Sequence, residues 1–269
     1  MVRLGWIGVK ENVMPFVEND GVRIQYLEEG SGAPLVFLHG FSIPLTMFEE
    51  LGYIDAFKAD YRVIVIESRG HGDSGKPAGV ESYRIEARVS DVLAVMDHLG
   101  IERTILMGLS LGAQTALAIA NIAPERVTAM VICSMHPYSL ANDEMRQGIL
   151  VALRQGMEAF VTATERRNGV PTPIARREYL LRQDSAALSD LFEAALKIGD
   201  LSEKLKSFHV PTLVCSGSED VEMHDLARKA AELMPMAQFV SMEGLNHAGE
   251  FFRTDLAIPM LREFFDAHR

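Results

Sequence analysis

The 269-residue sequence has few cysteines, no excess of basic charge and no long apolar run. Lys and Arg number 26 against 37 Asp and Glu, so the formal net charge is −11. Nucleic acids and anionic membrane surfaces attract proteins through basic faces, so this charge argues against both as partners. No stretch approaches the roughly 18 apolar residues of a membrane-spanning helix. The N-terminal apolar run is short and no small-residue cleavage site follows it, so no signal peptide is expected.

The two cysteines are too few for a disulfide framework. Cys133 and Cys215 each end a short apolar run, Ala-Met-Val-Ile-Cys and Thr-Leu-Val-Cys, so the plainest interpretation is two buried free thiols. Free thiols favour a reduced, cytoplasmic location. The sequence also lacks Cys and His clusters at zinc-binding spacing and has no H-E-x-x-H motif, so we expect no metal and no other cofactor.

Short apolar runs alternate with helical stretches through most of the chain. The Asn19-Asp20-Gly21 turn predicts a hairpin near the start. Alternation of this kind predicts an α/β protein with βαβ units and a mostly parallel eight-stranded sheet flanked by helices. Strands are expected at 13–19, 22–28, 34–38, 61–66, 104–107, 127–133, 211–215 and 238–242. Helices are expected at 47–58, 83–99, 111–122, 225–233 and 254–268.

Residues 136–206 break this alternation, because helical patterns follow one another there without a strand. Asn142, Thr172-Pro173 and Asp184 or Ser185 are candidate helix starts. We therefore predict an α/β core of residues 1–135 and 207–269 with an inserted all-helical lid at 136–206. The insertion holds ten Lys and Arg and ten Asp and Glu, so the net charge of −11 belongs to the core. Its arginines are expected to form a solvated face paired with acids, with a substrate carboxylate as the alternative partner: Arg154, Arg166, Arg167, Arg176, Arg177 and Arg182.

The motif that carries chemistry is Gly108-Leu109-Ser110-Leu111-Gly112, which reads G-x-S-x-G. It follows a predicted strand and opens a predicted helix, the context of a nucleophile elbow. In such a turn the serine oxygen rises above the sheet edge, and the amide of Leu111 lies at the start of the helix. That amide can donate to a developing oxyanion, helped by the helix dipole.

A nucleophilic serine needs a base, and the base needs a carboxylate to orient it. His247 follows the last predicted strand, and Asp220 follows the strand that ends near Cys215. The carboxyl ends of parallel strands share one edge of a sheet, so Ser110, Asp220 and His247 are expected to meet there. Glu219 is the competing acid.

These features resemble the α/β-hydrolase fold superfamily, specifically serine esterases and lactonases with a helical lid. The resemblance runs from about residue 13 to the end, and it rests on the hairpin, His39-Gly40-Phe41, Arg69 to Ser74, the elbow, Gly217-x-x-Asp220 and the His247 loop. It implies that the Phe41 amide is a second oxyanion donor beside Leu111. Three positions depart from the common pattern: Glu67 stands where an aspartate is usual, Ala113 where a glycine is frequent, and no proline follows Asp220.

Two other interpretations are weaker. The segment Gly70 to Gly75 matches G-x-G-x-x-G, but the loop Lys76-Pro77-Ala78-Gly79 follows it instead of a helix that could bind a dinucleotide pyrophosphate. Arg69, His71 and Asp73 are better explained as a turn network. A serine at the nucleophile position also excludes dehalogenation or epoxide hydrolysis through an aspartyl ester.

The predicted reaction is hydrolysis of a small to medium uncharged carboxylic ester through an acyl-enzyme, with Ser110 as nucleophile, His247 as base and Asp220 as the orienting acid. Residues expected to contact the substrate are His39, Gly40, Met135, His136 and Val221. A lactonase, a carbon–carbon bond hydrolase of ring-cleavage products and a ligand receptor that signals through its lid remain alternatives. The expected partner is a small-molecule ester or lactone, and the chain is expected to be a monomer or homodimer.

Overall fold

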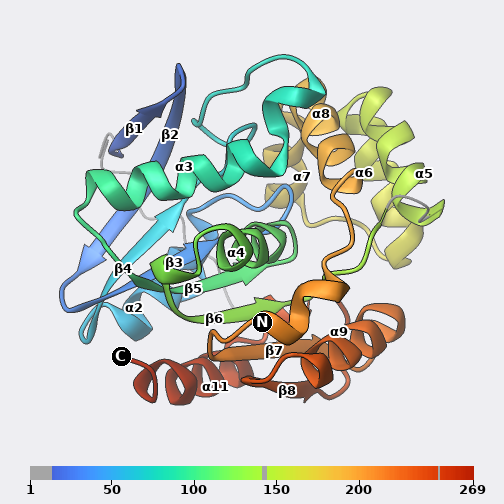
Figure 1. Ribbon diagram of the computed structural model, residues 1–269. Coiled ribbons are helices and arrows are strands. Elements are labelled where there is room, and N and C mark those ends of the chain that lie inside the picture. Colours follow the sequence, from blue (N-terminus) through green and yellow to red (C-terminus); the bar gives the residue numbers. More distant parts are fainter. Residues whose placement is uncertain (1–13, 141–143, 248) are drawn as a thin grey trace.

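The computed structural model describes residues 14–140, 144–247 and 249–269 and has one eight-stranded sheet at its centre (Figure 1). The strands lie in the order β1-β2-β4-β3-β5-β6-β7-β8. β1 and β2 pair antiparallel, β2 pairs antiparallel with β4, and the remaining pairs are parallel. The predicted mostly parallel sheet is thereby confirmed. The strands are β1 (Phe16–Asn19), β2 (Val22–Gly30), β3 (Ala33–Leu38), β4 (Tyr61–Ile66), β5 (Thr104–Leu109), β6 (Val127–Cys133), β7 (Thr212–Gly217) and β8 (Ala237–Met242).

Helices cover both faces of this sheet, as its apolar strands require. One core cluster lies under α3 (Ile85–His98), α4 (Leu111–Ile122) and α9 (Val221–Leu233). The other lies under α1 (Met47–Glu50), α2 (Tyr53–Phe57), α10 (Gly249–Phe252) and α11 (Thr254–Asp266). Short 3₁₀ turns η1 (Val80–Tyr83), η2 (Pro124–Arg126) and η3 (Ser202–Ser207) occupy connections.

Several helix boundaries differ from those predicted. The helix expected at 47–58 is two short helices, because Gly52 adopts φ 81° and interrupts it. α9 begins at Val221, four residues before the expected start, with Asp220 as its N-cap residue. The short helix α10 was not predicted. The cap at Asp184 is confirmed by its carboxylate, which accepts a hydrogen bond from the Ala187 amide at 3.0 Å, whereas Asn142 lies outside the described residues.

In the described part of the chain between β6 and β7 there are four α-helices: α5 (Glu144–Arg154), α6 (Met157–Asn168), α7 (Ile174–Leu181) and α8 (Ser185–Leu196). Figure 1 shows them grouped on one side of the molecule, next to α3 and α4. In the described part of 136–206 no strand occurs. Their apolar side chains form one cluster with Tyr83 and Leu111, so this helical insertion packs directly on the start of α4. The division of the chain into core and lid at 136 and 206 stays a prediction.

The prediction of two free thiols is wrong, because Cys133 and Cys215 form a disulfide. They are register partners on the adjacent parallel strands β6 and β7, with Cα atoms 4.9 Å apart. Neither apolar run reveals this pairing alone, since it arises from the register between strands 82 residues apart. The cytoplasmic location loses the support of free thiols and stays a prediction. Within residues 14–140, 144–247 and 249–269, no helix is long and apolar enough to cross a membrane.

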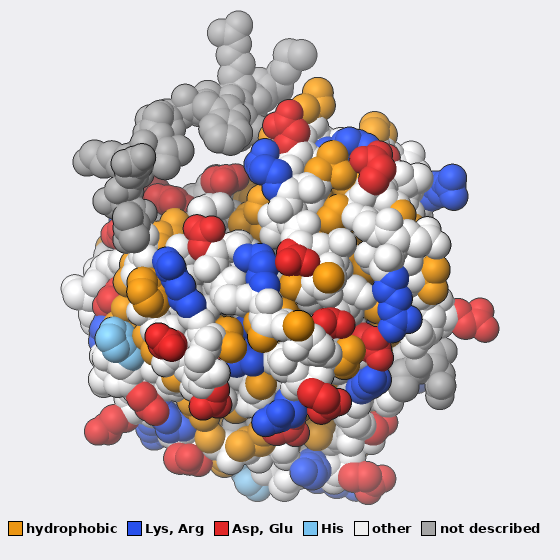
Figure 2. Space-filling view, turned by 90° about the horizontal axis from the view of Figure 1, so that it is seen from above, with side chains coloured by type: hydrophobic (Ala, Val, Ile, Leu, Met, Phe, Trp, Pro, Cys, Tyr) orange, Lys and Arg blue, Asp and Glu red, His pale blue; other side chains and the backbone are white. Residues whose placement is uncertain are grey.

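The surface carries charges of both signs. Figure 2 shows acidic and basic side chains interspersed over one face, without a continuous basic patch among its described residues. The expectation, drawn from net charge, that nucleic acid is not a partner stays a prediction.

Candidate active site

Ser110 occupies a sharp turn between β5 and α4. Its backbone angles are φ 49° and ψ −106°, a conformation that residues with side chains rarely adopt. Glycines on either side permit it: a Cβ at Gly108 would lie 2.5 Å from the Ala113 Cα, and one at Gly112 would overlap the backbone of Leu38 in β3. The strain holds the serine at the sheet edge, as expected for a nucleophile elbow.

The structure brings Ser110, His247 and Asp220 together from three loops that are far apart in the sequence. The Nε2 atom of His247 lies 3.2 Å from the Ser110 Oγ, and its Nδ1 lies 2.6 Å from the Asp220 Oδ2. Asp220 sits where β7 passes into α9, and His247 follows β8. This is the geometry in which an imidazole accepts the serine proton while a carboxylate fixes its tautomer.

Of the two predicted oxyanion donors, Leu111 follows Ser110 directly, and Phe41 lies in the loop after β3, the strand that pairs with β5. Leu111 is the first residue of α4, so its amide belongs to the helical turn that has no intrahelical acceptor. The loop with Phe41 is built by two buried histidines. His71 Nε2 accepts a hydrogen bond from the Ser42 amide at 2.9 Å. His39 Nδ1 donates to the Gly40 carbonyl at 2.8 Å, and its Nε2 accepts from the Ser68 amide at 2.9 Å.

His39 is completely buried, and burial lowers its pKa to about 4. The ring is therefore neutral and uses both nitrogens to join the loops after β3 and β4. These contacts assign His39 a positioning role for the loop of Phe41. Direct contact with a substrate, which the sequence predicted for His39, has no support in this geometry.

Glu67 is the buried carboxylate beneath the same loop. Its Oε1 accepts a hydrogen bond from the Leu45 amide at 3.1 Å and lies 3.8 Å from His39 Nε2. Burial raises the pKa of Glu67 to about 7. A side chain at Gly72, which has φ 43°, would collide with this carboxylate. The glutamate found in place of the usual aspartate thus fills space that the glycine leaves.

The segment from Gly70 to Gly75 is a closed turn and not the start of a helix. The Gly70 amide donates to the Gly75 carbonyl at 2.9 Å, and the next helical turn, η1, begins only at Val80. Arg69 anchors the turn through two 2.6 Å hydrogen bonds to Asp91 of α3. This geometry matches a loop held by a turn network.

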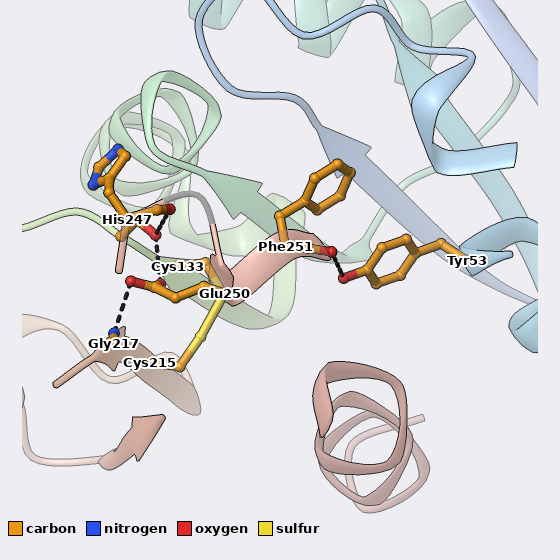
Figure 3. Close-up of a disulfide and its surroundings, with 8 residues drawn as sticks. Tyr53, Cys133, Cys215, Gly217, His247, Glu250 and Phe251 are labelled. Carbon is orange, nitrogen blue, oxygen red and sulfur yellow. Dashed lines mark hydrogen bonds between the residues drawn. A yellow bond between two sulfur atoms is a disulfide. The ribbon is translucent and has the colours of Figure 1, made fainter. Parts of the chain in front are cut away.

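Glu250 is a functional candidate that the sequence interpretation missed. It is 1% exposed, and its carboxylate accepts hydrogen bonds from the Ser134 hydroxyl and, at 2.7 Å, from the Gly217 amide. Ser134 Oγ also lies 3.4 Å from the His247 carbonyl oxygen. Figure 3 shows Glu250 between the ends of β6 and β7, with the His247 ring pointing away from it. A glutamate three residues after His247 in an apolar segment was the available signal.

Glu250 also lies near the disulfide, since its carboxylate and the sulfurs of Cys133 and Cys215 lie within 4.8 Å of one another. Such a group could hold a metal ion only through thiolates, and the sulfurs here are bonded to each other. The carboxylate links Ser134 after β6 with Gly217 at the end of β7, three residues before Asp220.

The other residues predicted to contact the substrate lie in different places. Gly40 is buried beside Leu109 and the Phe41 loop. Met135 packs in the core cluster of the α3 and α4 face. His136 lines a small cavity with Tyr138 behind the insertion, and its Nδ1 accepts from the Tyr138 amide at 3.2 Å. Val221 follows Asp220 and is 66% exposed.

Comparison with known proteins identifies relatives along nearly the whole chain. Residues 33–206 match the family model described as alpha/beta hydrolase fold. A non-heme chloroperoxidase of Streptomyces lividans is 26% identical over 253 residues, which cover 85% of this chain and 91% of that protein.

Two solved structures are similar over the same extent. The enol-lactonase of Burkholderia xenovorans superposes with a TM-score of 0.82 at 25% identity and covers 94% of this chain and 100% of its own. An enzyme described as degrading N-acyl homoserine lactones superposes with a TM-score of 0.71 at 29% identity, covering 93% and 100%. With the family model matched over more than half of its length, this chain belongs to the alpha/beta hydrolase fold family.

Proposed function

We propose that the protein is a serine hydrolase that cleaves carboxylic ester bonds through an acyl-enzyme. The observation that carries the proposal is the hydrogen-bonded chain from Ser110 through His247 to Asp220, with distances of 3.2 Å and 2.6 Å. His247 Nε2 takes the proton from Ser110 as its Oγ attacks the ester carbonyl. In this proposal the amides of Phe41 and Leu111 bind the oxyanion that forms. His247 then gives the proton to the leaving alcohol, and water releases the acid by the same steps.

A cyclic ester is the second candidate substrate. Two of the relatives with at least 25% identity over more than nine tenths of this chain are described as acting on lactones. A lactone uses the same three residues, and the released alcohol stays attached to the acyl group. The proposal therefore covers open-chain esters and lactones, which differ in the shape of the pocket that they need.

The test is a steady-state assay on 4-nitrophenyl esters of rising chain length and on several lactones, with wild type and Ser110→Ala. We expect Ser110→Ala to lose turnover by a factor on the order of 10⁶, as in other serine triads. Thr115→Ser, a change on the buried side of α4, is the matched control and should keep the activity. Ester cleavage at the wild-type rate in Ser110→Ala would refute the proposal.

A further inference from the structure

The arginines of the helical insertion differ in their partners. Arg154 pairs with Glu193, and Arg177 pairs with Glu158. Arg176, on the neighbouring position of α7, forms no ion pair with an acid in the described part of the chain. Its Nη2 donates to the Ser42 hydroxyl at 3.1 Å, and its Nη1 is buried without a hydrogen-bond partner. The expectation of a solvated, acid-paired face therefore fails for Arg176.

Tyr179 lies one turn further along α7 and shares this environment. The Arg176 guanidinium carbon stands 5.2 Å from the centre of the Tyr179 ring. The Tyr179 hydroxyl is also buried and has no hydrogen-bond partner within the described residues. Buried polar groups in native proteins nearly always have a partner, which can be a protein group, an ordered water or a ligand. Two neighbouring donors without an acceptor therefore mark a place where a ligand with acceptor atoms can bind.

These donors lie next to the proposed oxyanion site. Ser42, which Arg176 contacts, follows Phe41 directly, and adjacent Cα atoms are about 3.8 Å apart. Tyr179 and Phe41 both pack against the apolar cluster that contains Leu111, the residue after the nucleophile. The ring of Phe41 also meets Phe192 of α8 at 4.9 Å. One small molecule could therefore span the oxyanion amides and the Arg176 guanidinium.

The chemistry of the two donors selects the ligand. A guanidinium remains a cation at physiological pH and presents N–H groups in a planar fork, which matches the two oxygens of a carboxylate. Burial lowers the pKa of Arg176, and burial raises the pKa of the Tyr179 phenol, so Tyr179 is neutral and offers a hydroxyl donor. A bound carboxylate would supply the opposite charge and accept from both the free Nη1 and the Tyr179 hydroxyl.

We propose that Arg176 and Tyr179 form a carboxylate-binding subsite, so that the substrate is an ester or lactone bearing a free carboxylate group. This inference rests on the proposed function for the scissile bond, but the subsite is a property of the insertion and can be tested without catalysis. This anionic substrate takes the place of the uncharged substrate that the balanced charge of 136–206 predicted. The acidic core opposes an anionic substrate only at long range, where salt screens it.

The kinetic test compares two esters with the same six-carbon acyl chain, mono-4-nitrophenyl adipate and 4-nitrophenyl hexanoate, at a fixed ionic strength. They differ only in a terminal carboxylate or methyl group. We expect wild type to prefer the adipate ester in kcat/KM. Arg176→Gln should lower kcat/KM for the adipate ester by about 10- to 100-fold, the range for one hydrogen-bonded ion pair. Its kcat/KM for the hexanoate ester should change by less than about threefold. Tyr179→Phe should show a smaller loss with the same selectivity.

Arg177→Gln is the matched control, because Arg177 lies beside Arg176 on α7 but pairs with Glu158 on the surface. Arg177→Gln should leave kcat/KM unchanged for both esters. Thermal unfolding of each variant shows whether its fold is retained. The proposal is overturned if wild type shows no preference for the adipate ester. It is also overturned if Arg176→Gln lowers kcat/KM equally for both esters, since the arginine would then have a structural role.

A binding experiment separates this proposal from the proposed function. Isothermal titration of wild type and Arg176→Gln with adipic acid monoamide and with hexanamide requires no ester cleavage. Tighter binding of the monoamide that disappears in Arg176→Gln supports the subsite, even if neither ester is hydrolysed through Ser110. Equal binding of the two amides to wild type contradicts the subsite, even if ester hydrolysis proceeds.

Discussion

The free energy of unfolding should depend on pH through Glu250. Burial raises the pKa of Glu250 to about 7 from an ordinary value of 4.5, against the opposing effect of the hydrogen bond from Ser134. The folded protein therefore retains this proton between pH 4.5 and 7, while the unfolded chain has released it. Stability is thus highest below pH 4.5 and falls as the pH rises to about 7, after which this contribution is constant. The pKa difference corresponds to about 3 kcal/mol.

Glu250→Gln removes this dependence and keeps the contacts. The amide oxygen can accept from Gly217, and the amide nitrogen can donate to the Ser134 oxygen. The Ser134 proton can then turn to the His247 carbonyl, which lies 3.4 Å away. Gln is therefore a neutral copy of the protonated acid, and the variant should gain stability relative to wild type as the pH rises.

The assay is urea unfolding of wild type and Glu250→Gln at half-unit steps from pH 5 to pH 8. The stability difference in favour of Glu250→Gln should grow by about 2 to 3 kcal/mol over this interval. Glu67, whose pKa is also raised to about 7 by burial, acts equally on both proteins and cancels in the difference. Glu263→Gln on the exposed side of α11 is the control and should show no trend. A difference that is constant or that shrinks with rising pH would refute the reasoning.

Two further predictions concern the backbone and the disulfide. Gly112→Ala should abolish the folded, active protein because the added methyl group would overlap the backbone of β3. Gly148→Ala in α5, where an added methyl group would meet no atom within 4 Å, is the control and should raise stability by about 0.5 to 1 kcal/mol. Circular dichroism and thermal unfolding measure both effects. Reducing the bond between Cys133 and Cys215, which closes a loop with a sequence separation of 82, should lower stability by at most about 4.5 kcal/mol in urea unfolding. Thiol titration of unfolded, unreduced protein should find no free thiol, and two free thiols would contradict the disulfide.

The fold and the meeting of Ser110, His247 and Asp220 could be predicted from sequence because their signals are local. The elbow is a five-residue pattern, and each partner of Ser110 lies within a few residues of the end of a strand. The rule that parallel strands end at the same edge then brings Asp220 and His247 to the serine. No knowledge of exact register was needed, since loops at one edge meet over a range of registers.

Features that depend on register or on side-chain packing could not be predicted in this way. The disulfide requires Cys133 and Cys215 to be opposite each other on adjacent strands, and a shift of one residue would separate them. Glu250 was overlooked because its partners, Ser134 and Gly217, lie on two other loops. The break at Gly52 was missed because a glycine within a helical pattern is often tolerated.

The charge of the insertion shows why a sum over residues is a poor guide to a binding site. Ten acids and ten bases predict a neutral surface, and that prediction holds where the side chains pair with each other. A substrate, however, meets individual groups at short range, where pairing decides how much charge is available. Arg177 is compensated by Glu158, while Arg176, one residue before it, turns to Ser42 and keeps an unpaired donor. Adjacent residues on a helix point in directions about 100° apart, so Arg176 and Arg177 face different environments although they are the same residue type. In the proposed subsite, specificity thus depends on the face of α7 that each arginine occupies, and net charge carries no information about that.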